Sequence, residues 1–427
     1  MDPVTFTDDQ LDGLQWVSVD YFLKESNHRN GLIRDKTQEG APASIAAVGM
    51  ALATAPLGVE RGAFPREFFA RRTLNRLRFF WNSPQGTQAD ATGYKGFYYH
   101  FLDMDTGRRV WNCELSTVDS AFLLAGMLTA ATYFDQDTPE EHEIRTLADA
   151  LYRRVDWRWA QNGGATLTHG WRPETGFLPY RWEGYDEGLL LYVLGLGSPT
   201  YPLPEESYAA WASTYQWKTI YDWELLYCGP LFTHQLSHLW LDLRGIQDAF
   251  MREHGLDYFE NTRRATYVHQ QYAIRNPLEF AGYGEFCWGL TASDGPGPTV
   301  RLINGIERRF FDYIARGAPY GPDDGTIAPW AVVSSLPFAP EIVLPTIQQF
   351  SQMDLGMLQP YGFKATFNPT FTVEGRGWVS PWHFGIDQGP IILMIENYRS
   401  GLLWNLMRRC PCIATGLRRA GFTKGWL

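Results

Sequence analysis

Two acidic side chains stand where a carboxyl group could do chemistry. Glu187 lies in Gly184–Tyr192 (GYDEGLLLY), directly before an apolar helical stretch and close to Trp182 and Tyr185. Aromatic neighbours disfavour the charged form of a carboxyl and raise its pKa, as a general acid requires, although the dipole of the following helix acts in the opposite direction. The alternative is that the acids only stabilise the first helical turn, with Asp186 as the cap.

Asp387 is the second candidate. It is a lone acid in Phe384–Pro390 (FGIDQGP), ahead of the apolar stretch IILMIENY, and it follows Glu187 by 200 residues (387 − 187), about half a circuit if the chain forms one ring. A helix N-cap is one interpretation, since Asp is favoured there. The functional alternative is a carboxylate presented into a cavity. Two carboxyl groups facing each other across a pocket are the usual equipment for hydrolysing a glycosidic bond.

Two further acids occur in Trp111–Asp119 (WNCELSTVD). Glu114 closes a predicted β-hairpin, and Asp119 falls one turn into the next helix. Ser116 or Thr117 could cap that helix and leave Asp119 free or exposed. An acid in a first helical turn is more often electrostatic stabilisation than a catalyst.

His234, His238 and Asp242 fall on one helical face at i, i+4 and i+8, which resembles half of a metal site. The Glu that follows the first His in a zinc helix is missing here. Polar lining of a pocket, or buried hydrogen-bonded histidines, is therefore the favoured interpretation.

Clusters that mix aromatic rings with polar groups supply candidate sugar contacts. One cluster has Trp288, followed by Asp294 in Thr291–Pro296 (TASDGP). The other has Trp382 in Trp378–His383 (WVSPWH). Flat ring faces suit sugar rings, but each cluster could equally be a packed loop. Phosphate-binding glycine loops and the Gly-x-Ser-x-Gly elbow are absent from the sequence.

The elements that must position these residues are mostly helical. Periodic apolar patterns predict about twelve helices. They fall near 7–22, 43–57, 65–82, 115–134, 139–159, 186–196, 205–216, 229–251, 257–275, 299–316, 340–353 and 389–408. Capping boxes at Thr7–Gln10 and Thr138–Glu141 mark two helix starts. Without an alternating strand pattern, this predicts an all-α body in which inner and outer helices close a double ring.

Two stretches, 96–111 and 165–182, carry aromatic or β-branched runs around a turn and predict β-hairpins at one end of the helical body. A third stretch, 354–389, is rich in Pro and Gly and predicts an irregular connection. Long connections of this kind tend to carry function.

Composition excludes several classes. The chain has 427 residues with 47 acidic and 37 basic side chains, a net charge of −10 and a pI of about 5.4. Nucleic acids and anionic membranes need basic faces, so neither is an expected partner. No apolar run reaches the roughly 20 residues that span a bilayer. The chain opens without a basic-then-apolar signal, which predicts a cytoplasmic protein or a trimmed export product. Five unpaired cysteine positions predict free thiols.

In these motifs the chain resembles the bacterial glycoamylase-like domain family, which includes glycoside hydrolase family 144, the β-1,2-glucanases. The resemblance rests on seven segments spread in order over nearly the whole sequence. They are Phe22–Asp35, Glu114–Gly126, Tyr185–Pro199, Gly229–Ala265, Trp288–Pro296, Asp324–Glu341 and Val379–Arg399.

The resemblance implies one (α/α)6 toroid over 1–427 and inverting hydrolysis of β-1,2-glucan to sophorose or short sophorooligosaccharides, without a metal or organic cofactor. It places Glu187 at the general-acid position and makes Asp387 the candidate base. Direct inversion would set these carboxyl groups roughly 6.5–9.5 Å apart. Substrate contacts are then expected from the remaining candidates, which are Glu114, Asp119, Trp182, Tyr185, His234, Trp288, Asp294 and Trp382.

Two alternatives stay open at this point. A transglycosylase on the same scaffold would pass the glycosyl unit to a sugar rather than to water. A non-catalytic glucan-binding module would use both acids as helix caps only.

Overall fold

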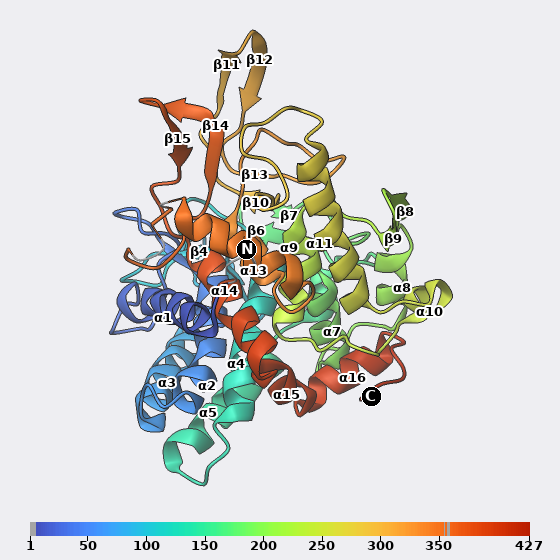
Figure 1. Ribbon diagram of the computed structural model, residues 1–427. Helices are drawn as coiled ribbons and strands as arrows, with labels where there is room; N and C mark the ends of the chain where they lie inside the picture. The colour runs from blue at the N-terminus through green and yellow to red at the C-terminus, as the bar shows by residue number, and fades with distance from the viewer. Residues whose placement is uncertain (1–5, 354, 357–358) are drawn as a thin grey trace. The chain divides into compact units, whose positions relative to one another are not determined.

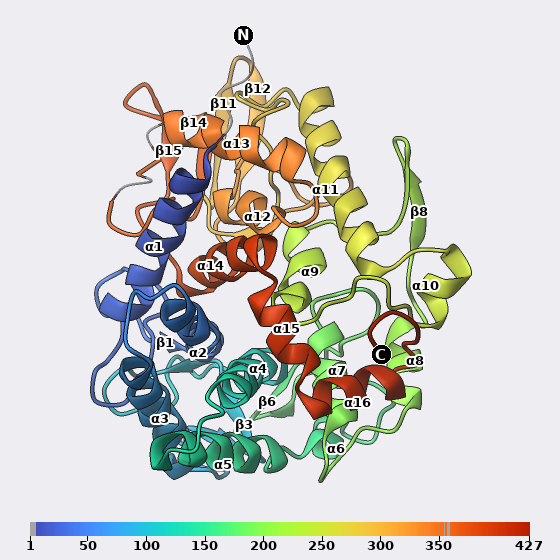
Figure 2. The same cartoon turned by 60° about the horizontal axis from the view of Figure 1, so that its bottom comes forward.

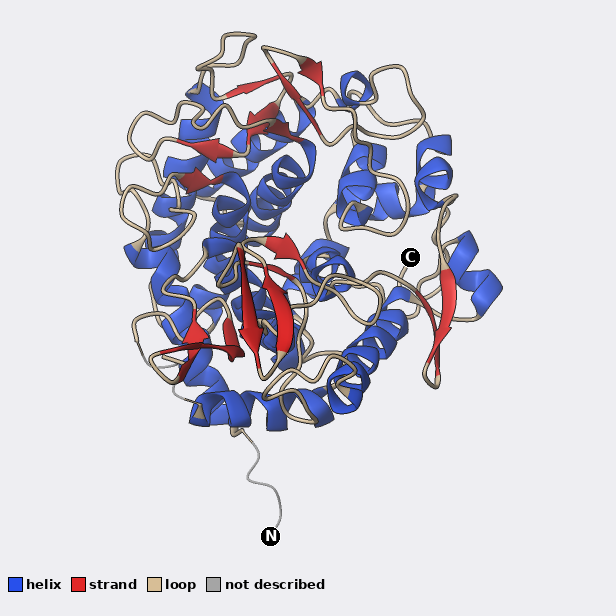
Figure 3. Cartoon of the chain, turned by 90° about the horizontal axis from the view of Figure 1, so that it is seen from above, coloured by secondary structure: helices blue, strands red, loops and turns tan. Residues whose placement is uncertain are grey.

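The computed structural model describes residues 6–353, 355–356 and 359–427. The described chain is mainly helical, with short strands in small sheets (Figure 3). It divides into two compact units. Unit 1 takes the described residues of Met1–Tyr21 together with Gln216–Leu236 and Tyr258–Arg399, and unit 2 takes Phe22–Tyr215, Ser237–Asp257 and Ser400–Leu427. The single domain expected over 1–427 stays a prediction.

Unit 2 holds the larger set of helices and one five-stranded sheet. Its helices are α2 (Ile45–Glu60), α3 (Arg66–Asn82), α4 (Thr117–Tyr133), α5 (Pro139–Arg153), α6 (Trp157–Ala160), α7 (Leu189–Gly197), α8 (Glu206–Ala212), α10 (Ala249–His254), α15 (Leu402–Arg408) and α16 (Pro411–Arg419). Its strands are β1 (Ala43–Ser44), β2 (Gly93–Tyr94), β3 (Phe97–Tyr99), β4 (Phe101–Leu102), β5 (Leu115–Ser116), β6 (Gly170–Arg172) and β7 (Gly176–Phe177). The sheet runs in the order β2-β3-β5-β6-β7 with every pair antiparallel, and β1 pairs with β4.

Unit 1 combines helices with separate β-hairpins. Its helices are most of α1 (Asp8–Lys24), α9 (Leu231–Gln235), α11 (Tyr258–Arg275), α12 (Pro329–Ser334), α13 (Pro340–Gln352) and α14 (Gly385–Arg399), and the 3₁₀ turn η1 (Leu236–Leu239) begins at its boundary. Its strands are β8 (Trp217–Ile220), β9 (Trp223–Leu226), β10 (Ala292–Ser293), β11 (Thr299–Ile303), β12 (Ile306–Phe310), β13 (Ile314–Ala315), β14 (Phe367–Val373) and β15 (Arg376–Val379). They form the antiparallel pairs β8-β9, β10-β13, β11-β12 and β14-β15.

The core of unit 2 depends on a close crossing of α2 and α4, which lie side by side in Figure 2. Both helices are buried along nearly their whole length. The crossing is made by facing glycines: a Cβ on Gly126 would lie 2.0 Å from the carbonyl oxygen of Gly49, and a Cβ on Gly49 would lie 2.3 Å from that of Phe122. The two backbones therefore touch, and no side chain fits between them.

We expect Gly126→Ala to destabilise the protein by about 1–3 kcal/mol, because the added methyl group must push two helix backbones apart. Gly13→Ala is the matched control, since Gly13 lies within α1 and a Cβ added there would meet nothing within 4 Å. That change should be neutral or stabilising by up to about 1 kcal/mol. Urea unfolding of both variants measures the difference, and equal midpoints would contradict the close crossing.

The capping box predicted at Thr7–Gln10 is confirmed, and the one predicted at Thr138–Glu141 is confirmed in part. The Thr7 amide donates to Gln10 Oε1 at 2.9 Å and the Gln10 amide to Thr7 Oγ1 at 3.2 Å, ahead of α1. The Thr138 hydroxyl accepts from the Glu141 amide at 3.3 Å and begins α5. The Glu141 carboxylate accepts instead from the Gln136 amide and from Arg66 Nε, both at 2.7 Å, so this second start has the Thr138 cap without the return bond. Both helix starts were predictable because a cap needs only the few residues around it.

The helix predicted over 299–316 is wrong. The segment forms the β11-β12 hairpin, which projects above α13 in Figure 1. Its turn is Asn304-Gly305, where both residues have positive φ, 51° and 80°. An Asn-Gly pair between β-branched runs is a strong signal for a two-residue hairpin turn, and it outweighs the weak helical period of this stretch.

Other predicted helices are shorter or divided. The helix expected over 229–251 becomes α9, η1 and, after an irregular stretch, α10; the one over 139–159 divides into α5 and α6; and the one over 389–408 divides into α14 and α15 around Gly401, whose φ is 67°. Helices α12 and α16 were not predicted. Of the described helices, none is both long and apolar enough to cross a membrane.

The hairpin predicted over 165–182 is confirmed by the β6-β7 pair and the Thr168–Arg181 bridge. The one over 96–111 is only partly correct: β3 pairs with β2 and β5, while β4 pairs with β1, and a Leu102–Arg109 bridge closes the turn. The described part of 354–389 is less irregular than predicted, because it contains the β14-β15 hairpin. Residues 354, 357 and 358 of that prediction lie outside the described residues.

Candidate functional site

A histidine in unit 2 links two of the predicted acids. His100 lies between β3 and β4, and its Nδ1 is 2.9 Å from Glu114 Oε1 while its Nε2 is 3.6 Å from Asp119 Oδ2. Burial opposes protonation of His100, but the charges of Asp119 and Glu114 outweigh it and raise the pKa of the histidine to about 9. At neutral pH the ring is therefore an imidazolium that faces a carboxylate on each side.

Glu114 and Asp119 are placed by the junction of β5 and α4. Ser116 ends the strand and caps the helix, its hydroxyl accepting from the Asp119 amide at 3.2 Å and donating to Asp119 Oδ2 at 2.5 Å. The expectation that Asp119 is free or exposed is wrong, because it is buried and bonded on two sides. Burial acts to raise the pKa of Glu114, but the hydrogen bond and charge of His100 leave that pKa below its ordinary value.

Glu187 lies in the turn that leads into α7 and is half-buried. Burial of its carboxyl raises the pKa of Glu187 to about 8, and the negative charges of Asp186 and Asp119 act in the same direction. Acid groups gathered in a desolvated place cannot all ionise, so one keeps its proton. Glu187 is thus protonated at neutral pH, as the sequence-based hypothesis of a general acid requires.

The turn before Glu187 is fixed by its neighbour. Asp186 Oδ1 accepts from the Gly188 amide at 2.8 Å and from Trp211 Nε1 at 2.9 Å. Burial raises the pKa of Asp186 to about 7 against these two hydrogen bonds. Gly188 is the residue preceding α7, so Asp186 stabilises the approach to the helix, close to the capping role considered from sequence.

The aromatic candidates of unit 2 differ in how much ring they present. Trp182 is only 7% exposed; its Nε1 donates to Thr117 Oγ1 at 2.9 Å, and its ring stacks on His169 with centroids 3.9 Å apart. Tyr185 is half-buried and meets Tyr215 edge to face at 5.8 Å. Tyr185 is therefore the more accessible of the two rings beside Glu187 in the sequence.

The second predicted catalytic acid belongs to unit 1. Asp387 is buried, and it is the third residue of α14 rather than the N-cap, with its amide donating to the Phe384 carbonyl at 3.1 Å. The structure describes each unit by itself, so the predicted pairing of Asp387 with Glu187 stays a prediction.

Asp294 of unit 1 accepts two short hydrogen bonds. Ser380 Oγ donates to its Oδ2 at 2.6 Å, and Thr366 Oγ1 donates to its Oδ1 at 2.8 Å. Trp382, half-buried, lies two residues after Ser380, and its amide donates to the Ser380 hydroxyl at 3.3 Å. Asp294, Ser380 and Trp382 thus form one polar–aromatic group, which joins residues that the sequence analysis had placed in two separate clusters.

A buried ion pair holds the backbone of this group. Arg316 Nε and Nη2 each donate to Asp324 at 2.8 Å, and both side chains are fully buried. The same guanidinium donates to the Ser293 carbonyl at 2.7 Å and to the Asp294 carbonyl at 3.4 Å. The position of the loop that carries Asp294 therefore depends on Arg316.

Two sequence candidates belong to the interior instead. Trp288 is fully buried in the core of unit 1 and donates from Nε1 to Thr346 Oγ1 at 2.9 Å, so its ring offers no platform to a sugar. His234 is buried, with Nε2 3.1 Å from the Cys228 carbonyl, and burial lowers its pKa to about 4. His234 is a neutral, hydrogen-bonded core histidine, which is the favoured alternative of the sequence interpretation.

Asp242, the third member of the pattern with His234 and His238, is bound by Arg244 at 2.7 Å and also by Arg408. Within the part of the chain that the structure describes, no three His, Cys, Asp or Glu side chains gather as a metal site would require.

Sequence reasoning did not identify Asp35 and His100. They belong to one cluster of interacting titratable side chains in unit 2, which also includes Glu114, Asp119, Asp186 and Glu187. Burial raises the pKa of Asp35 to about 6, partly offset by the charge of His100. Their signal was present but indirect: Asp35 ends the segment Phe22–Asp35 that carries the family resemblance, and His100 interrupts an aromatic strand (GFYYHF).

Comparison with known proteins identifies the family. The family described as "Glycoamylase: Putative glucoamylase" matches residues 179–411, more than half of the chain. The chain belongs to this family, which confirms the resemblance found in the sequence motifs.

Three individual proteins show what this chain is similar to within and around the family. The exo β-1,2-glucooligosaccharide sophorohydrolase (non-reducing end) of Parabacteroides distasonis is 30% identical over 97% of this chain, and the chain spans 58% of that protein's length. A glucoamylase-type protein of Bacteroides uniformis is 34% identical with a TM-score of 0.87, and 99% of each chain is covered. The endo-β-1,2-glucanase of Chitinophaga pinensis, solved with sophorotriose and glucose, is 27% identical with a TM-score of 0.86 over 98% of this chain and 99% of its own.

Proposed function

We propose that this protein is an inverting glycoside hydrolase that cleaves β-1,2-glucan or its oligosaccharides. The observation that carries the proposal is the state of Glu187, a half-buried carboxyl whose pKa is raised to about 8 by burial and by neighbouring acids. A carboxyl that keeps its proton at neutral pH can donate it to a glycosidic oxygen as the bond breaks. We also propose that the helices of the chain form the expected (α/α)6 toroid as a single domain.

Glu187 is the general acid in this proposal, and Asp387 is the base that takes a proton from the attacking water, directly or through a sugar hydroxyl. The imidazolium of His100 holds the pKa of Glu114 below its ordinary value, and Asp119 lies on the other side of the same ring. These two carboxylates are then hydrogen-bond acceptors for sugar hydroxyl groups. Tyr185 and Trp182 of unit 2 and Asp294 and Trp382 of unit 1 complete the proposed substrate contacts.

The substrate class is supported by the relatives. One is a sophorohydrolase that acts from the non-reducing end, and another is an endo-glucanase solved with sophorotriose, so both are directed to β-1,2-linked glucose. The two differ in whether they act at an end or within the chain. We propose that this protein is likewise specific for the β-1,2 linkage. The pattern of its products distinguishes action at a chain end from action within the chain.

The direct experiment is incubation with linear β-1,2-glucan beside β-1,3-, β-1,4- and α-linked glucans, with product sizing and NMR of the first anomer released. Hydrolysis of the β-1,2 polymer alone, with release of the α-anomer, is expected. Sophorose alone would indicate exo action, and a ladder of oligosaccharides endo action. Longer or cyclic products would indicate transglycosylation instead of hydrolysis. Failure to release any product from β-1,2-glucan would overturn the proposal.

The pH profile should show the ionisation of Glu187. Because the acid form is required and the pKa of the free enzyme's Glu187 is about 8, kcat/KM should fall as pH rises through about 8, by about tenfold per pH unit above it. Asp186, with its pKa raised to about 7, titrates in the same range, so the limb reports the pair together. An alkaline limb near pH 5 would contradict the assignment.

Asp186→Asn should move that limb to lower pH. The amide keeps an oxygen to accept from the Gly188 amide and Trp211 but removes the negative charge that raises the pKa of Glu187. The measurement is kcat/KM from pH 5 to about 9 for both proteins. A limb that stays in place, or moves upward, would show that Asp186 does not act on the catalytic proton.

A further inference from the structure

Two of the five free cysteines lie against each other in unit 2. The sulfurs of Cys410 and Cys412 are 3.2 Å apart, Cys410 being buried and Cys412 half-buried. Cys410 is the residue that precedes α16, Pro411 is its first residue, and Cys412 its second. An extended residue followed directly by a helical turn therefore brings the two side chains to the same side of the backbone.

The distance favours reaction between the sulfurs. A disulfide bond is about 2.05 Å long, so closing this pair requires the sulfurs to approach by roughly 1 Å. The remaining cysteines are placed differently. Cys113 and Cys287 are buried, and the Sγ of Cys228 donates to Thr233 Oγ1 at 3.3 Å.

The environment of the pair makes the two thiols unequal. The hydrogen bond from Cys412 lowers the pKa of Cys410, helped by the amides at the start of α16, whereas the same bond and burial raise the pKa of Cys412. In a pair of adjacent thiols of unequal pKa, the sulfur of lower pKa can attack an oxidant and the other can complete the disulfide.

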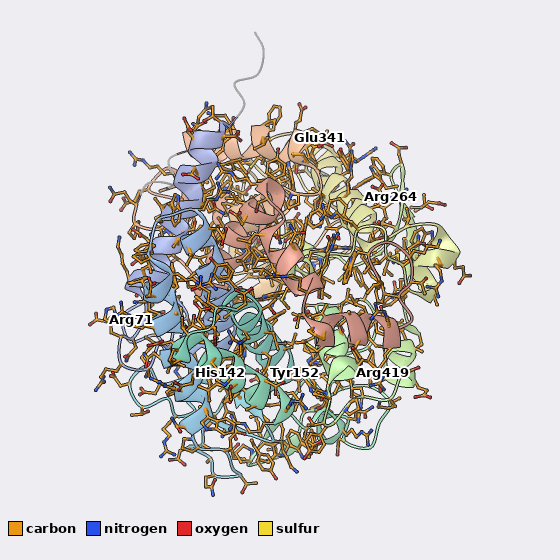
Figure 4. The ribbon with its side chains drawn as sticks, turned by 90° about the horizontal axis from the view of Figure 1, so that it is seen from below. Arg71, His142, Tyr152, Arg264, Glu341 and Arg419 are labelled. Carbon is orange, nitrogen blue, oxygen red and sulfur yellow. The ribbon has the colours of Figure 1, made fainter. Side chains whose placement is uncertain are left out.

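The pair also adjoins the helix that follows Glu187. A Cβ on Gly197, the last residue of α7, would lie 2.1 Å from the Cys412 carbonyl oxygen. Tyr152 and Arg419, labelled in Figure 4, bind the same helix: Tyr152 donates to the Leu194 carbonyl at 2.6 Å and Arg419 to the Leu196 carbonyl at 2.7 Å. The backbone at Cys412 therefore packs directly against the C-terminal end of α7.

We propose that Cys410 and Cys412 form a reversible dithiol–disulfide site that responds to peroxides. The Cys410 sulfur attacks one oxygen of hydrogen peroxide, the O–O bond breaks, and a sulfenic acid forms as one water leaves. The Cys412 sulfur then attacks the oxidised sulfur and displaces a second water. Two thiols and one peroxide thus give one disulfide and two waters, the thiols being oxidised by two electrons and the peroxide reduced by two.

The test is treatment of the folded full chain with a modest excess of hydrogen peroxide, followed by alkylation, thiol counting and peptide mapping. The expected result is the loss of two of the five free thiols, a mass lower by about 2 Da, and an internal 410–412 linkage that dithiothreitol reverses. Disulfides between two chains, linkage to another cysteine, or retention of all five thiols would overturn the proposal.

Matched variants locate the reaction. Cys228→Ser removes a half-buried thiol outside the pair and should still lose two thiols to peroxide. Cys412→Ser should lose none by disulfide formation and should accumulate sulfenic or sulfinic acid at Cys410, about 16 or 32 Da heavier. Disulfide formation that persists in Cys412→Ser would contradict the assignment. Peptide mapping of the unsubstituted protein decides the proposal even where a variant folds poorly.

Discussion

Glu187→Gln is expected to lower kcat on β-1,2-glucan by about 10²–10⁴-fold, the usual contribution of a positioned general acid. The amide matches the carboxyl in size but cannot donate the proton that the leaving oxygen needs. Since the substitution also removes a protonated acid from the cluster with Asp186 and Asp119, it should cost little stability. Turnover and thermal unfolding of the variant measure these two effects, and glucan binding is measured beside them.

Glu183→Gln is the matched control. Glu183 lies four residues earlier, is exposed, and accepts from Thr166 Oγ1 at 2.8 Å, so its amide should leave kcat within a factor of about two. Loss of turnover with retained glucan binding in Glu187→Gln alone would exclude a binding module. Equal activity in both variants would remove Glu187 from the catalytic step and with it the leading proposal.

Arg316→Met is expected to cost about 3–5 kcal/mol of folding free energy, the largest stability effect we predict. It leaves the fully buried carboxylate of Asp324 without its cation, and an unpaired buried charge is expensive. The amides of Phe311 and Thr326, at 2.9 and 3.1 Å, still donate to Asp324 and offset part of the cost. Urea unfolding measures the change.

Arg301→Met provides the control for the loss of an arginine. Arg301 is exposed, with its guanidinium 3.6 Å from the centroid of the Phe371 ring, so its removal should cost about 1 kcal/mol or less. If Arg316→Met proves foldable, we also expect a higher KM with kcat less affected, because the Ser293 and Asp294 carbonyls lose their donor. Equal stability of the two variants would contradict the role of the buried pair.

Much of the fold was accessible from the sequence where the signal is local. The caps at Thr7 and Thr138 and the β6-β7 hairpin needed only neighbouring residues. The prediction failed at 299–316, where a helical period was preferred over the Asn304-Gly305 turn. It also missed α16. The amphipathic pattern of this helix is short, and its apolar side packs against α7, which is far away in the sequence.

The candidate site shows the same limit. Glu187 could be singled out because it stands beside aromatic residues in the sequence. His100 and Asp35 gave only an indirect signal, since they join the other acids through β-strand pairing and chain folding. Trp288 shows the converse: an aromatic residue among polar neighbours in sequence is fully buried in the core. Composition around a residue does not reveal which side of it faces the interior.

The close contact of α7 with α16 has a consequence for synthesis of the protein. All nine residues of α7 are buried, and all are aliphatic or glycine apart from Tyr192. Gly416 of α16 packs so closely on this helix that a Cβ added to it would lie 2.0 Å from the Val193 carbonyl oxygen. At about 5–20 residues per second, a ribosome needs roughly 10–45 s to make the 213 residues (411 − 197 − 1) between the two helices. During that time the side of α7 that faces α16 stays uncovered, although α4 is already available to the helix, so we expect a chaperone to bind this apolar surface until translation finishes.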